Sequence, residues 1–265
     1  MSGANSPLVS EHQWSVPDTV PIRGVVLVTH GLNNKPSVMD KFATYLVGDG
    51  YAVLRLALTG HRGEGNPKEL TTAENWRGDL LRAFRAITTR FPDQPIYTVG
   101  YSLGALVTIV VVDENPAMKF SRMVFLAPAV SLSTKTRFIE LLTPFRFVGS
   151  SLPSLTPPQY RSRGTTPLAA YNAMFSLEGD AEKLTRKQEL NEIPTKIFLS
   201  SGDELVSVKR LKRWLSKNEL VTWTVHELAP SGTSYNHLIV DEDSLGHAEW
   251  ERLTSEISAF FREAS

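Results

Sequence analysis

The feature that most constrains the fold of this chain is a short turn at residues 100–104, which reads Gly-Tyr-Ser-Leu-Gly. A β-branched, apolar run at residues 96–99 leads directly into it, and an apolar, helix-like run at residues 105–112 leads directly out. A strand-to-helix turn this sharp strains the backbone of the serine, and side chains two residues before and after it would collide. Glycines at both of those positions remove the side chains.

Two interpretations of Ser102 follow from this turn. A serine can simply cap a helix, and the G-x-S-x-G pattern alone is not specific. Here, however, the pattern lies between an expected strand and an expected helix. The helix N-terminus then offers free N–H groups and a dipole that favour developing negative charge beside the hydroxyl. We therefore interpret Ser102 as a nucleophile.

Short β-branched runs alternate along the chain with longer segments of helical period. The expected strands lie at residues 24–29, 51–56, 96–100, 122–127, 196–200 and 221–226. Continuous apolar runs suit strands that are covered on both faces of a parallel sheet. Between and after them, apolar side chains recur at helical spacing, as from Trp76 to Phe91 and from Trp250 to Phe260. We expect one α/β domain over residues 1–265, with a mostly parallel sheet and helices on both faces.

A long segment between residues 127 and 195 interrupts this alternation, because it holds no clear strand. Loops of such length are usually functional. Its apolar side chains are broken up by prolines, which suits a small mobile cap, and we expect a cap at residues 131–192. The alternative is a set of extra helices that completes the core.

Composition limits the possible partners and chemistry. Lys plus Arg and Asp plus Glu are equal at 28 each, so nothing favours a nucleic acid. The absence of cysteine excludes disulfides, cysteine–zinc sites and a thiol nucleophile. We see no signal peptide in the first twelve residues and no apolar run long enough to span a bilayer. We expect a cytoplasmic protein without stable membrane insertion.

With its turn at residues 100–104 in this setting, the chain resembles the α/β-hydrolase superfamily, and within it the small capped esterases and monoacylglycerol lipases. The resemblance extends from about residue 24 to residue 261. It implies the α/β-hydrolase fold, with a small cap inserted after the sixth strand of that fold. It also implies a catalytic triad in the chain order serine, aspartate, histidine.

The resemblance supplies candidates for the other two triad members. Asp203 follows the strand expected at residues 196–200, where the family has its acid, although Gly-Asp sequences are also common in plain turns. An alternative family position for the acid, after the preceding strand, holds no carboxylate here. His237 follows the last expected strand, where the family has its base. The implied catalytic residues are therefore Ser102, Asp203 and His237.

The resemblance also implies an oxyanion hole. The sequence His-Gly-Leu at residues 30–32 directly follows an expected strand and matches the H-G-x turn of the family. The backbone N–H groups of Leu32 and Leu103 would be the two donors. We expect His30 to shape this turn by hydrogen bonding and not to transfer protons.

Other polar residues near these motifs have structural roles in our interpretation. His61 lies in a turn at residues 60–63 that resembles a G-H-G turn of the family with an arginine inserted, and we assign it no catalytic role. Glu204 is expected to point away from the site if Asp203 points in. We expect His226 to be a partly buried strand residue, and His247 to be solvated at the start of the final helix.

The resemblance implies a serine hydrolase that cleaves carboxylic esters, of the carboxylesterase or monoacylglycerol lipase type, through an acyl-enzyme on Ser102. Its partner would be a small-molecule acyl ester, without a metal or another cofactor. Thioesterases, amidases and peptidases use the same triad, and binding proteins without activity share the scaffold, so these alternatives stay open. We expect apolar residues of the cap, which could also touch lipid transiently, to line an acyl-chain site: Phe138, Leu141, Leu142, Phe145, Met174 and Phe175.

Overall fold

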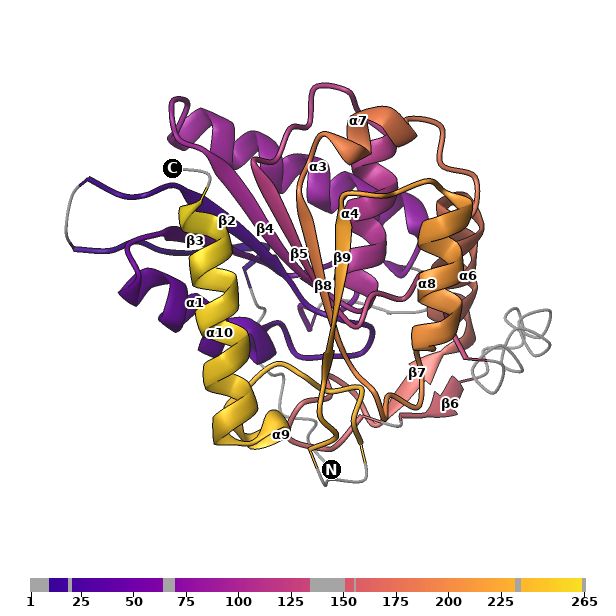
Figure 1. Cartoon of the computed structure of the whole chain (residues 1–265). Coiled ribbons are helices and arrows are strands. Elements are labelled where there is room, and N and C mark those ends of the chain that lie inside the picture. Colours follow the sequence, from indigo (N-terminus) through magenta and orange to yellow (C-terminus); the bar gives the residue numbers. More distant parts are fainter. Residues whose placement is uncertain are drawn as a thin grey trace.

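A seven-stranded sheet forms the centre of the molecule (Figure 1). The computed structural model describes residues 10–18, 21–63, 70–133, 151–154, 156–231 and 235–263. The strand order across the sheet is β1-β3-β2-β4-β5-β8-β9. β1 pairs antiparallel with β3, and the other neighbours pair parallel. The strands of this sheet are β1 (His12–Ser15), β2 (Val25–Thr29), β3 (Ala52–Leu56), β4 (Ile96–Tyr101), β5 (Arg122–Leu126), β8 (Thr195–Ser200) and β9 (Trp223–Leu228).

The six strands expected from the sequence are all present, which confirms the prediction of a mostly parallel sheet. β2 and β3 are buried along their whole length, as their continuous apolar runs indicate. β9 begins two residues later than expected, because Val221 lies in the preceding turn with 84% of its surface exposed. β1 is an addition that the sequence did not reveal, since its four residues hold no apolar run.

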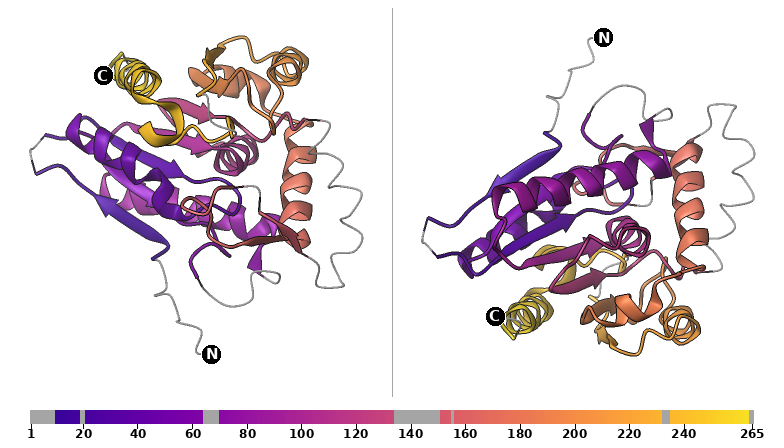
Figure 2. Two further views of the ribbon diagram at one scale, coloured as in Figure 1. Left: turned by 90° about the horizontal axis from the view of Figure 1, so that it is seen from below. Right: turned by 90° about the horizontal axis from the view of Figure 1, so that it is seen from above.

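Helices cover both faces of the sheet (Figure 2). α1 (Asp40–Gly48) packs with α10 (His247–Arg262) on one face, and α3 (Ala73–Arg90) packs with α4 (Leu103–Glu114) on the other. Three further helical elements lie outside the segment between β5 and β8: the 3₁₀ helix η1 (Pro36–Met39), α8 (Val208–Lys217) and α9 (Glu242–Leu245). None of the helices in the described ranges combines the length and the apolar character that crossing a membrane requires.

The segment between β5 and β8 contains structure of its own. It holds two short antiparallel strands, β6 (Ser151–Pro153) and β7 (Thr165–Pro167), and two helices, α6 (Leu168–Ala181) and α7 (Lys187–Asn191). α6 packs against α4 and α3, and Leu177 and Ala181 are fully buried, so this helix adds to the core. Residues 134–150 lie outside the described ranges. The cap at residues 131–192 stays a prediction.

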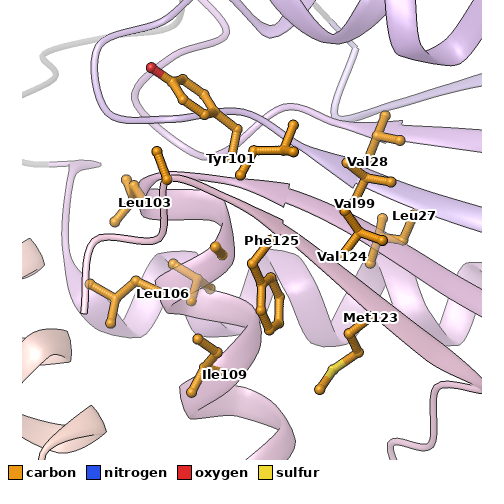
Figure 3. Close-up of a cluster of buried hydrophobic side chains, with 14 of the residues drawn as sticks. Leu27, Val28, Val99, Tyr101, Leu103, Leu106, Ile109, Met123, Val124 and Phe125 are labelled. Carbon is orange, nitrogen blue, oxygen red and sulfur yellow. The ribbon is translucent and has the colours of Figure 1, made fainter. Parts of the chain in front are cut away.

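The core is tightly filled beneath the end of β4 (Figure 3). Leu106 and Ile109 of α4 and Phe125 of β5 belong to this buried cluster. α4 is buried on every side from Leu103 to Asp113. A helix that is apolar on all sides packs against other elements on all sides. The residue at its N-terminus, Ser102, therefore has a fixed place.

Candidate active site

The turn between β4 and α4 is strained at Ser102, which has φ 49° and ψ −109° and is the N-cap of α4. Both flanking glycines are required by close backbone contacts. A Cβ on Gly100 would lie 2.8 Å from Cα of Ala105, and a Cβ on Gly104 would lie 2.5 Å from the carbonyl oxygen of Thr29. These approaches are closer than real Cβ atoms tolerate, so a side chain at either position would collide with the backbone, as expected from the sequence.

A hydrogen-bonded chain runs from this serine through the imidazole of His237 to a carboxylate. Nε2 of His237 lies 3.0 Å from Oγ of Ser102, and Nδ1 lies 2.8 Å from Oδ2 of Asp203. The carboxylate fixes the tautomer: Nδ1–H donates to Asp203, and Nε2 accepts from the serine hydroxyl. All three expected triad residues thus meet at the carboxyl ends of the parallel strands.

Asp203 is held in place by the backbone that follows it. Its Oδ1 accepts from the N–H groups of Leu205 and Val206, both at 2.8 Å, while Oδ2 faces His237. The side chain has no exposed surface. A carboxylate with three donors keeps its orientation, and these donors compensate its charge.

Glu204 has a role that the sequence did not reveal. Its two carboxylate oxygens accept from the backbone N–H groups of Asn236 and His237, at 3.0 and 3.3 Å. It therefore holds the loop that carries His237. No sequence signal could find this contact, because the donors are backbone groups 32 and 33 residues away.

Two backbone N–H groups are free beside Ser102. Among the described residues, no hydrogen bond uses the N–H of Leu32 or of Leu103. Leu103 is the first residue of α4, where the N–H groups have no partner within the helix. The two donors expected for an oxyanion hole are therefore available to a ligand.

His30 shapes the turn that carries Leu32, which is the role predicted for it. Its Nδ1–H donates to the carbonyl of Gly31 at 2.8 Å, and its Nε2 accepts from the N–H of Leu58 at 3.1 Å. Complete burial lowers the pKa of His30 well below its ordinary value, so the ring is neutral.

The remaining histidines that the sequence analysis weighed have other partners. His61 accepts a hydrogen bond from the N–H of Asn33 through Nε2, at 3.0 Å. His226 lies in β9 with its Nδ1 3.2 Å from Glu256. His247 is the first residue of α10, with 68% of its side chain exposed, and lies 2.7 Å from Glu242.

A pocket opens over Ser102 and His237, with about 600 Å³ of empty space when its mouth is included. Its apolar wall consists of Leu32, Leu132, Met174 and Leu205. Its hydroxyl-bearing wall, as we call the polar part of the lining, consists of Asn33, Asn34, Tyr101, Ser154, Thr156, Thr166, Tyr171 and Tyr235. Burial raises the pKa of all three of these tyrosines, so they stay protonated.

The residues predicted for an acyl-chain site have different positions. Met174 of α6 lines the pocket. Phe175 is partly buried and packs against the hydrophobic core. The other four lie outside the described ranges: Phe138, Leu141, Leu142 and Phe145. The side chains of the hydroxyl-bearing wall were not foreseen, because Ser154, Thr156 and Thr166 carry no motif.

Comparison with known families agrees with this fold. Residues 20–192 match the sequence model of the family described as serine aminopeptidase, S33. The chain belongs to this α/β-hydrolase family. Within the α/β-hydrolases, its curated relatives are monoglyceride lipases, which confirms the branch that the sequence resemblance indicated.

Two of these relatives show how far the similarity extends. The mouse monoglyceride lipase is 26% identical over 135 residues, which is 51% of this α/β-hydrolase and 44% of the mouse protein. The monoglyceride lipase homolog of monkeypox virus is 25% identical over 145 residues, which is 52% of each chain. The chain spans about half the length of the curated relatives it matches.

Solved structures confirm the α/β-hydrolase fold over the whole chain. A soluble variant of monoglyceride lipase from Saccharomyces cerevisiae superposes with a TM-score of 0.77 at 12% identity, covering 100% of this chain and 98% of the yeast chain. A structure from work on two metagenome-derived lipolytic enzymes has a TM-score of 0.76 at 22% identity, with 97% and 100% covered. Identities this low establish the fold alone.

Proposed function

We propose that this α/β-hydrolase cleaves carboxylic esters through an acyl-enzyme on Ser102, as a carboxylesterase or monoacylglycerol lipase. The observation that carries the proposal is the continuous hydrogen-bonded chain from Ser102 through His237 to Asp203. The two free N–H groups beside the serine and the similarity to monoglyceride lipases support it.

The proposed reaction has two halves. In the first, His237 takes the proton of Ser102 as its oxygen attacks the ester carbonyl, and the N–H groups of Leu32 and Leu103 stabilise the oxyanion. Asp203 stabilises the imidazolium, which then protonates the departing alcohol and leaves the acyl group on the serine. In the second half, water loses a proton to His237 and attacks the acyl-enzyme; the acid is released and the imidazolium returns the proton to the Ser102 oxygen.

The pocket favours a neutral ester over a substrate with a free amine. Among the described residues that line it, no side chain bears a carboxylate, which an N-terminal ammonium group needs as a partner. We therefore place ester hydrolysis ahead of the aminopeptidase activity that the family description names. Met174 and the leucines of the apolar wall support an acyl group of medium length.

Hydrolysis of p-nitrophenyl esters of increasing chain length tests this proposal. We expect Ser102→Ala to lower kcat by roughly 10⁴–10⁶, because the nucleophile is lost. Ser216→Ala on the exposed side of α8 is the matched control and should retain full activity. We expect medium-chain esters to exceed the acetate in kcat/KM and an aminoacyl p-nitroanilide to react poorly. Undiminished hydrolysis by Ser102→Ala would contradict the proposal.

A further inference from the structure

We infer that Asn33 is a positioning residue for the oxyanion hole, which it fastens to residues 160–163 of the segment between β5 and β8. This inference rests on the proposed function. Asn33 follows the proposed donor Leu32 in the chain, is 6% exposed and has φ 54°, in the left-handed region. A residue other than glycine in this conformation costs free energy, which its surroundings have to offset.

Its side chain is paired in both directions with one residue far along the chain. Nδ2 of Asn33 donates to the carbonyl of Arg163 at 2.9 Å, and Oδ1 accepts from the N–H of Arg163 at 3.2 Å. The carboxamide thus makes the same pair of hydrogen bonds that a backbone residue makes with its partner in a neighbouring strand. The main-chain carbonyl of Asn33 adds a third bond, accepting from the N–H of Ser162 at 2.7 Å.

The pairing continues on the neighbouring residues. The N–H of Lys35 donates to the carbonyl of Tyr160 at 2.9 Å, and Asn34 forms an isolated antiparallel bridge with Arg161. Residues 33–35 and 160–163 therefore lie side by side as a short ladder. Nothing in the sequence of either segment indicates this contact, since they are about 125 residues apart.

Hydrogen bonds on the core side fix two successive peptide planes. The N–H of Leu32 belongs to the same planar group as the carbonyl of Gly31, which His30 holds at 2.8 Å. The next plane is held through the N–H of Asn33, which donates to His61 at 3.0 Å. Asn33 is therefore held on one side by His61 and on the other by the ladder. Because Asn33 directly follows Leu32, we infer that these bonds also fix the direction of the Leu32 N–H.

Asn33→Gly isolates this role, because glycine keeps the backbone groups and relieves the left-handed strain while it removes the carboxamide. We expect kcat on p-nitrophenyl esters to fall about tenfold, a fraction of the 10²–10³ that the loss of a whole donor costs. KM should stay within about twofold, since an oxyanion donor acts on the transition state. The affinity for an alkyl boronic acid, which forms a tetrahedral adduct with a nucleophilic serine, should fall by about the same factor as kcat.

Glu219→Gly is the matched control. Glu219 is also a non-glycine residue in the left-handed region, with φ 56°, but it is exposed at the end of α8. We expect its kcat and its boronic acid affinity to equal those of the wild type. Asn33→Asp keeps the acceptor and loses the donor to Arg163, and we expect a smaller loss in both quantities than in Asn33→Gly.

The outcomes separate this inference from the proposed function. Wild-type kcat and boronic acid affinity in Asn33→Gly would overturn the inference, and so would a change confined to KM, which would make Asn33 a plain pocket contact. If Asn33→Gly does not fold, Asn33→Asp decides by the same criteria. Ester hydrolysis that survives Ser102→Ala would instead overturn the proposed function, whatever the Asn33 variants do.

Discussion

The turn that carries Ser102 and the turn that carries Leu32 meet at the carboxyl end of the sheet, but they are held by different means. The serine turn is fixed by steric contacts: Gly100 lies against Ala105 of the same turn, Gly104 lies against the end of β2, and helix α4 is fully buried. The leucine turn is fixed by hydrogen bonds from His61 and from residues 160–163, which lie far away in the sequence. The serine turn is marked in its own sequence by two glycines, whereas the contacts that hold the leucine turn leave no pattern in its sequence.

The two turns touch through Gly104, whose missing side chain leaves room for the carbonyl oxygens of Thr29 and His30. This contact makes the comparison testable. A change at the contact should disturb both turns together, whereas a change in the hydrogen bonds of the leucine turn should leave the serine turn intact.

The largest effect is expected for Gly104→Ala. The added methyl group would lie 2.5 Å from a backbone oxygen that cannot move aside, so α4 must shift away from the leucine turn and take the N–H of Leu103 with it. We expect kcat to fall by about 10³, as for the loss of an oxyanion donor. We expect the free energy of unfolding to decrease by about 1–3 kcal/mol, as for other overpacked sites. Steady-state kinetics and urea denaturation measure the two effects.

Gly179→Ala is the matched control, because it makes the same substitution in helix α6 where the new Cβ meets nothing within 4 Å. We expect unchanged kcat and a gain in stability of up to about 1 kcal/mol, since alanine is the better helix former. If both variants behave alike, the serine turn is not held by sterics.

A smaller effect is expected for His30→Gln, which changes how the free energy of unfolding depends on pH through the leucine turn alone. Burial lowers the pKa of His30 well below its ordinary value, whereas the unfolded chain binds this proton near pH 6.5. The stability from neutral His30 is therefore complete above about pH 6.5 and is lost as the pH falls below it. In His30→Gln, we expect the decline in unfolding free energy between pH 6.5 and 5 to be shallower, by up to about 1.4 kcal/mol per pH unit. If urea titrations at several pH values give the same dependence of the unfolding free energy on pH in both proteins, His30 does not control this response.

The same difference explains how much of the molecule the sequence could predict. The six strands follow from continuous β-branched runs, and the serine turn follows from two glycines at fixed spacing, because both are local patterns. Asp203 and His237 could be proposed only through their resemblance to family motifs. The fold then brings His237 next to Ser102 and Glu204.

What the sequence could not predict depends on backbone groups and on distant pairing. The hold of Glu204 on the loop of His237 uses main-chain N–H groups, which every residue except proline carries. Residues 33–35 and 160–163 form a ladder, but neither segment has a hydrophobic pattern in its sequence that would predict the pairing. The hydroxyl-bearing wall of the pocket draws single polar residues from several elements, and only the fold brings them together.

The most direct test of the central claim is to locate a covalent adduct on the intact protein. A fluorophosphonate reacts with a serine only where a neighbouring base activates it and an oxyanion hole receives the phosphonyl oxygen. We expect one adduct per chain by intact-mass spectrometry, on the peptide that contains Ser102, and none in Ser102→Ala. An adduct on another residue, or labelling of Ser102→Ala at the rate of the wild type, would contradict the account.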